Sequence, residues 1–174
     1  GVGNESAALK TRTSYLSIVN EDGGGASAIN VANTGTLVLG RVLQSGADST
    51  GSITIMNVGA MSIPQFDPFV SDLPVRIGSG AGPIRLSSTG SLTVDGKVES
   101  ASGSIVLAAG ANAPLKINST AVVTTATGNI ALKGKQVSNS GTVTAPVGSI
   151  STDEATAPPV PPIKPPVQPP VTPP

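Results

Sequence analysis

The side chains of this sequence that could carry acid–base chemistry are mainly carboxylates. The chain contains neither cysteine nor histidine, so thiolate nucleophiles, disulfides, histidine bases and imidazole–metal sites are excluded. Four acids are candidates for catalysis: Asp67, Asp72, Asp95 and Glu99. Hydrolysis of sugar bonds by paired carboxylates requires two acids that face one cleft. Asp95 and Glu99 flank Lys97 in the stretch DGKVE, which is typical of a solvated corner. We therefore predict no catalytic residue, no metal site and no cofactor.

The stretch PQFDPFVSDLP, residues 64–74, combines the features of a binding loop. It contains both phenylalanines of the chain, two aspartates and three prolines. Phe66 and Phe69 could stack on a sugar or enter an apolar pocket of a partner, and Asp67 and Asp72 could accept hydroxyl protons or hold a cation. These four residues are the candidate ligand- or partner-binding residues. The alternative is that both rings fold back and cover the flank of the domain, because exposed phenylalanine favours aggregation.

Composition excludes several classes of function. Ten basic and ten acidic residues give a net charge of zero, which argues against binding to nucleic acid and against electrostatic binding to membranes. No apolar run approaches the length of a membrane-spanning helix, so we expect no membrane insertion. With one tyrosine, two phenylalanines and no tryptophan among 174 residues, the core must be built from aliphatic side chains.

A degenerate repeat positions these residues. A glycine and a small residue precede an alternating aliphatic run at Leu37, Ile53, Ile84, Ile105, Ile130 and Ile150, and Leu16 fits the alternation without the glycine. The steps average about 22 residues, and one step of 31 residues contains the 64–74 stretch. Alternation with a period of two predicts strands with one buried face. Glycine, serine, threonine and β-branched residues dominate residues 10–150, so helices are not expected there.

These observations predict an all-β fold, a parallel β-helix (solenoid) of about six coils with two or three short strands in each coil. Residues 1–15 form an N-terminal lead-in or partial coil, residues 16–152 form the β-helix with an inserted loop at 64–74, and residues 153–174 form a proline-rich tail. A β-sandwich is the alternative. It is disfavoured because only two Asp-Gly pairs, at 22–23 and 95–96, could form tight hairpin turns.

Two stretches, GSLTVDGKVESASGSIVLAAG (90–110) and ATGNIALKGKQVSNSGTVTAPVGSIS (126–151), resemble the coils of filamentous haemagglutinin-type adhesins. The resemblance covers roughly residues 16–151. It implies a right-handed β-helix in the shaft of a large exoprotein of Gram-negative bacteria, secreted through an outer-membrane partner (two-partner secretion). It also implies secretion or display on the cell surface and a role in adhesion, aggregation or biofilm formation.

The C-terminal segment differs in kind. PPVPPIKPPVQPPVTPP has no core-forming pattern and predicts a disordered or polyproline II tail that serves as a spacer or linker. Proline lacks a backbone donor, so this segment cannot extend the stack of strands.

The function predicted from the sequence is a structural and adhesive segment of a bacterial surface or secreted exoprotein, with host-cell or matrix glycans and proteins as partners. The first alternative is a β-helical carbohydrate-active enzyme, which three aromatic residues poorly equip for sugar binding. The second is a purely structural module that associates end to end with itself.

Overall fold

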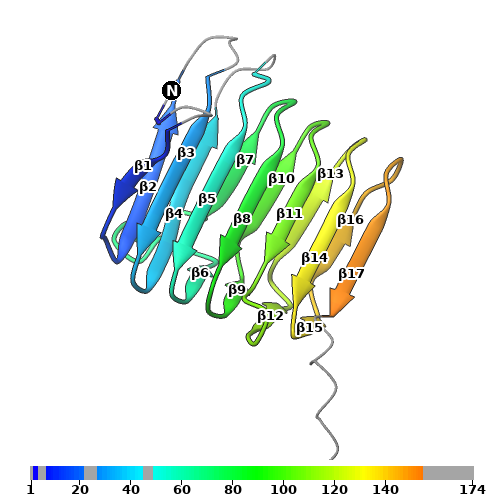
Figure 1. Cartoon of the computed structure of the whole chain (residues 1–174). Helices are drawn as coiled ribbons and strands as arrows, with labels where there is room; N and C mark the ends of the chain where they lie inside the picture. The colour runs from blue at the N-terminus through cyan, green and yellow to red at the C-terminus, as the bar shows by residue number, and fades with distance from the viewer. Residues whose placement is uncertain (1, 4–6, 22–26, 45–48, 155–174) are drawn as a thin grey trace, which may run out of the picture.

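The computed structural model of the chain describes residues 2–3, 7–21, 27–44 and 49–154, which form a right-handed parallel β-helix of about six coils (Figure 1). All regular secondary structure in these residues is strand, so the all-β prediction is confirmed. In the same residues no helix exists that could cross a membrane. The chain therefore stacks short strands along one axis, from β1 at one end to β17 at the other.

One side of the stack is a seven-stranded parallel sheet, here called face 1. Each coil contributes one strand to it, and neighbouring strands in the sheet come from successive coils. Its members, in spatial order, are β1 (Leu9–Thr11), β3 (Ile29–Thr34), β5 (Ile53–Val58), β8 (Ile84–Ser88), β11 (Ile105–Ala108), β14 (Ile130–Gly134) and β17 (Ile150–Glu154).

The strands outside face 1 form a second sheet, which starts as one face and then divides into two faces, here called face 2 and face 3. Strand β2 (Tyr15–Asn20) pairs with the long strand β4 (Leu37–Gln44). The first half of β4 pairs with β6 and its second half pairs with β7. Face 2 then continues through β6 (Met61–Ile63), β9 (Leu92–Val94), β12 (Pro114–Ile117) and β15 (Gln136–Asn139); face 3 continues through β7 (Arg76–Ser79), β10 (Lys97–Ser100), β13 (Val122–Thr125) and β16 (Thr142–Thr144).

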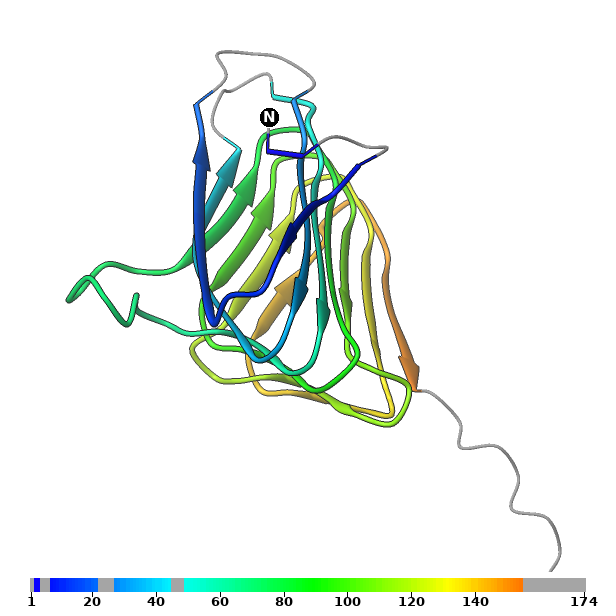
Figure 2. The same ribbon diagram turned by 60° about the vertical axis from the view of Figure 1, so that its left-hand side comes forward.

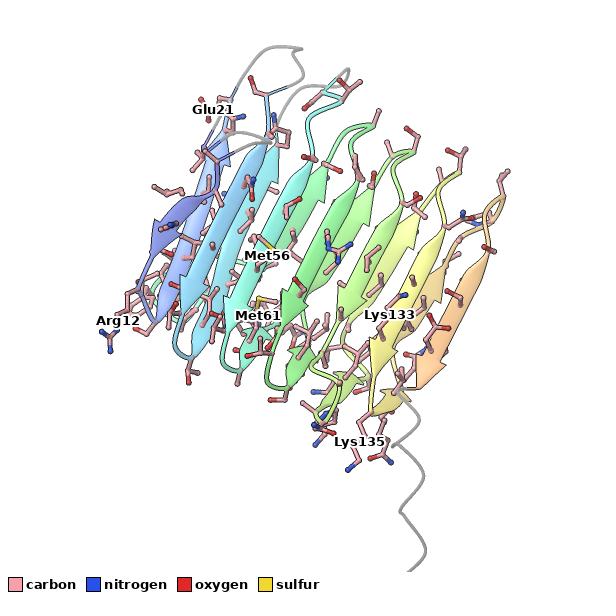
Figure 3. All side chains as sticks on the ribbon, in the orientation of Figure 1. Arg12, Glu21, Met56, Met61, Lys133 and Lys135 are labelled. Atoms are coloured by element: carbon pink, nitrogen blue, oxygen red, sulfur yellow. The ribbon has the colours of Figure 1, made fainter. Side chains whose placement is uncertain are left out.

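Aliphatic side chains fill the interior in rows that run along the axis. On face 1 the first inward row contains Ile29, Ile53, Ile84, Ile105, Ile130 and Ile150, each aligned with the next. The first five of these are fully or almost fully buried. Alternation along the strands places the two methionines differently. Met61 on β6 points inward and is 2% exposed, whereas Met56 on β5 is 44% exposed on the outer surface (Figure 3). Each buried aliphatic contributes roughly 1.5–3 kcal/mol before the entropy cost of ordering its coil.

The repeat that the sequence predicts is correct for the last five anchors and wrong for the first two. Ile53 aligns with Ile29, 24 residues earlier, and not with Leu37. Leu37 lies on β4 and aligns with Met61 on face 2, and Leu16 aligns with Leu39. The Leu37 assignment fails because the Gly-small-aliphatic pattern also occurs at the corner between faces 1 and 2, where Gly35-Thr36 precedes Leu37. The Leu16 assignment fails because alternation alone, without the glycine, does not distinguish one face from another.

The glycine that lies two residues before each face 1 strand from β5 to β17 is required by close backbone contact. A Cβ atom built on Gly82 would lie 1.9 Å from the carbonyl oxygen of Gly51, and one on Gly103 would lie 2.2 Å from that of Gly82. The same holds for Gly128 against Gly103 and for Gly148 against Gly128. No side chain fits where the corner of one coil rests on the backbone of the previous coil. A different glycine, Gly59, combines such a contact with a φ of 132°.

Polar ladders fill the corner between faces 1 and 2. Asn33 Nδ2 donates to Asn57 Oδ1 at 2.9 Å, and Asn57 Nδ2 donates to the carbonyls of Gly35 and Ala60 at 2.9 and 2.8 Å. In the next coil Ser88 occupies the same position and donates to the carbonyl of Gly59. Both asparagines are buried, so these bonds satisfy their polar side chains and add donors to carbonyls at the corner.

The described stack begins with β1 and ends with β17. Strand β1 stacks on β3 within the segment predicted as a lead-in or partial coil, and β17 reaches Glu154. The predicted disordered or polyproline II conformation of the tail falls on residues 155–174, which lie outside the described residues.

Candidate functional site at the insertion

The insertion leaves the stack between β6 and β7. Figure 2 shows residues 64–74 projecting sideways from the coils, while the coils before and after them remain stacked. Phe66 and Pro74 form an antiparallel bridge, and two backbone bonds close the base: Asp67 N–H donates to Leu73 O at 2.8 Å and Val75 N–H donates to Gln65 O at 3.0 Å. The segment is therefore a closed loop with an internal ladder.

The carboxylate of Asp67 attaches the loop to the first coil. Tyr15, on β2, donates its hydroxyl proton to Asp67 Oδ2 at 2.5 Å. The backbone N–H of Phe69 donates to Asp67 Oδ1 at 2.9 Å. Asp67 is 6% exposed, so both oxygens of a buried carboxylate have hydrogen-bond donors. Asp67 thus organises the loop from inside.

Aromatic packing supports the same attachment. The rings of Tyr15 and Phe69 meet edge to face with their centroids 4.6 Å apart. Such pairs contribute about 0.5–1.5 kcal/mol beyond the area that they bury. Gly40 on β4 makes the contact possible, because a Cβ atom there would lie 2.1 Å from the Tyr15 hydroxyl oxygen and 2.9 Å from Asp67 Oδ2.

The pKa values of the two partners shift in opposite directions. The hydrogen bond from Tyr15, followed by that from the Phe69 backbone, holds the pKa of Asp67 below its ordinary value. Burial, followed by the hydrogen bond to Asp67, raises the pKa of Tyr15. Both shifts favour a neutral phenol that donates to an ionised carboxylate.

The tip of the loop exposes apolar surface. Phe69 is 74% exposed despite its contact with Tyr15, Val70 is 51% exposed and Phe66 is 48% exposed. The alternative predicts that both rings fold back and cover the flank of the domain. Only the contact between Phe69 and Tyr15 agrees with it, because both rings remain exposed. Asp72 is exposed and has a φ of 61°, a left-handed conformation that aspartate tolerates better than most residues.

Of the four predicted binding residues, the loop thus presents three outward and keeps one inside. Phe66, Phe69 and Asp72 lie on its surface, and Asp67 lies within. The sequence prediction missed Tyr15 and Gly40. The only available signals were that Tyr15 is the single tyrosine and that Gly40 interrupts an aliphatic strand. Neither signal connects these residues to a loop that begins 24 or more positions away.

The other candidate acids have separate structural partners. Glu99, on the outer side of face 3, pairs with Arg76 and with Lys97, the latter at 2.6 Å. Asp95 lies at the corner before β10 and accepts a hydrogen bond from Asn118 Nδ2 at 2.7 Å. A groove of about 630 Å³ runs beside Glu99, with Ser79, Ser100 and Thr125 in its lining. Among the described residues Glu99 is the single carboxylate that lines this groove, so no two described acids face it.

The described residues contain no group of three or more aspartate, glutamate, cysteine or histidine side chains that could hold a metal ion. Asp67, the most enclosed acid of the loop, already receives two hydrogen bonds. The arrangement at the loop is suited to presenting an apolar surface rather than to coordinating a cation.

Comparison with known proteins gives no match: no family model, curated protein or solved structure is significantly similar to this chain.

Proposed function

We propose that this chain is a structural and adhesive segment of a secreted or surface-displayed bacterial exoprotein. The β-helix serves as a rigid shaft, and residues 64–74 serve as the contact point for a partner. The observation that carries the proposal is the loop itself. It is an insertion between two strands of a stacked coil, fixed from below by Asp67 and Tyr15, with two phenylalanines exposed at its surface.

The shape of the loop supports a binding role rather than a purely structural one. Exposed phenylalanine costs solubility, and a soluble chain gains nothing from two such residues on a projecting segment unless they contact a partner. Tyr15 and the internal ladder hold the segment in one conformation, which lowers the entropy cost of binding. Phe66 and Phe69 then act as apolar anchors, and Asp72 provides a polar contact at the rim.

The location that we propose is the exterior of a Gram-negative cell, with export through an outer-membrane partner. Its support is the sequence resemblance to filamentous haemagglutinin-type coils together with the parallel β-helix that the described residues form. The partners that we propose are glycans or proteins of host cells or matrix, and the outcome of binding is adhesion, aggregation or biofilm formation.

The proposal is tested by surface attachment of the purified chain to mammalian cells and to a glycan array. The double variant Phe66→Ala/Phe69→Ala should lose most of its attachment, because both anchors are removed. The matched control is Met56→Ala/Val58→Ala, which removes two apolar side chains of comparable exposure from face 1, away from the loop.

Circular dichroism must show equal β-content for all three proteins before attachment is compared. Loss of attachment in the loop variant alone supports an adhesive loop on a shaft. Equal attachment of all three proteins, or none by any of them, contradicts the proposal and leaves a spacer as the function of this segment.

A further inference from the structure

We propose that the two ends of this β-helix bind each other in different copies of the chain, so that β17 of one copy extends a parallel ladder onto β1 of the next. This inference is independent of the proposed function of the loop. It starts from the free edges of face 1. Among the described strands, β17 pairs only with β14 and β1 pairs only with β3. Unpaired edges of this kind are templates for a further strand.

Within the described part of the chain, the apolar rows end in side chains that are partly exposed. Ile150 ends the first inward row of face 1 and is 48% exposed, whereas Ile130 beside it is buried. At the opposite end, Val2 bridges to Ile29 at the start of the same row and is only partly buried. A second copy placed one coil beyond β17 would bring its Val2 onto Ile150 and continue the row.

Face 3 gives the same correspondence. Its inward row ends at Val143, which aligns with Val123. The row begins with Ile18, which aligns with Val42. Both end residues are partly buried against the core, so stacking would cover them against each other. The two ends therefore match on two faces at one common register.

Charge complementarity selects a second copy of this chain as the occupant. One outward row of face 1 contains, in order, Lys10, Ala32, Met56, Ser87, Ala108, Lys133 and Asp153. Lys133 Nζ lies 3.1 Å from Asp153 Oδ2, so neighbours in this row are close enough to form ion pairs (Figure 3 labels Lys133). Lys10 has no ion-pair partner among the described residues. In the stacked register, Lys10 of the second copy would lie beside Asp153 of the first.

The backbone N–H and C=O groups at the two free edges also alternate in the register that pairing requires. Ile130 N–H donates to Ser149 O, so in this parallel ladder Ile150 and Thr152 direct their backbone groups away from β14. Val2 exchanges backbone hydrogen bonds with Ala28 and Asn30, so Asn30 and, by alternation, Ala32 direct their backbone groups toward β1. In the register of β1 with β3, Leu9 then directs its N–H and C=O toward β3, and Lys10 directs its own toward the free edge. Thr152 of one copy and Lys10 of the next would then be bonded directly.

Because the two contacting surfaces differ, the interface is heterologous and does not close. Such contacts produce linear assemblies that grow with concentration. The order of the ladder would be β14, β17, then β1 and β3 of the next copy, with the two coil axes collinear.

The test is sedimentation velocity of the 174-residue chain over a range of concentrations, with electron microscopy of the assembled samples. Thr152→Pro removes the free-edge donor of β17, and Lys10→Pro removes that of β1, without removing a bond inside the chain. Each should weaken association by about tenfold or more, since a ladder bond is lost and the proline ring obstructs the edge. Thr152→Val and Lys10→Arg are matched controls that keep the N–H groups and should associate like the parent.

A mixture of the two proline variants gives the sharpest outcome. Each variant retains one intact end, so an equimolar mixture should form heterodimers and nothing longer, while each variant alone stays monomeric. Lys10→Glu, which leaves every backbone group in place, should also weaken association by opposing Asp153. Added salt should weaken association of the parent but strengthen association of this variant, because it screens an attraction in the first and a repulsion in the second.

Three results would overturn the proposal: a parent chain that is monomeric up to its solubility limit, proline variants that assemble as the parent does, or long assemblies in the mixture. Should a proline variant lose β-content, the comparison of Lys10→Glu with Lys10→Arg decides the question.

Discussion

At the scale of the residue, this protein depends on a few polar and small side chains in an aliphatic background. Tyr15 and Asp67 are 52 positions apart, yet they form the bond that attaches the loop to the first coil. Gly40 matters to this bond only because it has no side chain. The exposure of Phe69 and the burial of Asp67 are two consequences of the same arrangement.

The Tyr15–Asp67 bond predicts a pH window for attachment of the loop. The folded-state pKa of Asp67 lies below its unfolded value, so its contribution is fully present above about pH 4 and is lost as the pH falls further. The folded-state pKa of Tyr15 lies above its unfolded value, so its contribution is present below about pH 10 and is lost as the pH rises through the folded pKa. Attachment should therefore be strongest between these limits.

Tyrosinate absorbance measures this directly, because Tyr15 is the only tyrosine and the chain has no tryptophan. Tyr15 should titrate above the pH of free tyrosine. In Asp67→Asn the titration should move part of the way back, since burial, the larger cause, remains. A titration that is unchanged in Asp67→Asn would show that the hydrogen bond does not form in solution.

At the scale of the element, the corners decide how closely the coils stack. Strand pairing fixes the spacing between coils, and the glycine before each face 1 strand from β5 to β17 allows one backbone to rest on the previous one. Asn33, Asn57 and Ser88 then satisfy the carbonyls at the next corner. The unit repeated along this protein is therefore a face 1 strand together with the corner residues on either side of it.

Gly103→Ala tests the corner contact. Its Cβ atom would approach both the carbonyl carbon and oxygen of Gly82 within 2.3 Å, and backbone cannot move aside as a side chain can. We expect a loss of about 1–3 kcal/mol in the free energy of unfolding, measured by denaturant titration.

Gly78→Ala is the matched control for this change. Its nearest neighbours are side-chain atoms of Arg76 and Leu43, at 3.2 and 3.3 Å, which can shift at low cost. This variant should be within about 0.5 kcal/mol of the parent. Equal stability of the two alanine variants would contradict the close-contact explanation of the repeat.

At the scale of the whole molecule, stability is distributed along one axis. In the described sheets each strand pairs only with strands of the coils before and after it, and the contact of the 64–74 loop with Tyr15 is the described exception. A coil at either end therefore has half the strand neighbours of a coil in the middle. The fully buried side chains follow this trend, since most of the largest lie between β3 and β11 and none lies on β15, β16 or β17.

Amide hydrogen exchange should show this gradient. Strands β5, β8 and β11 should exchange slowest, and β1, β15, β16 and β17 should exchange fastest, because end coils open without breaking the middle of the stack. The exchange rates should be measured at low protein concentration, where the proposed end-to-end contact is absent. At high concentration, protection of β1 and β17 should rise together if that contact forms. Uniform protection along the axis at low concentration would indicate a single cooperative unit instead.

The sequence alone determined the all-β class, the parallel coils and the position of the insertion. Alternation and glycine spacing are local properties, and each coil must repeat them to bury its own aliphatics against the next. The alignment of Ile84, Ile105, Ile130 and Ile150, and the surplus at 64–74, could therefore be predicted without coordinates.

The tertiary structure decided which strand belongs to which face and which residues of different coils meet. Leu37 could not be assigned to face 2 from its neighbours, because the same Gly-small-aliphatic pattern serves at two different corners. Tyr15 could not be assigned to Asp67, because the hydrogen bond joins residues brought together only by the winding of two coils. Local pattern specifies the strands, whereas the register between coils and the way that the loop folds back decide which distant side chains meet.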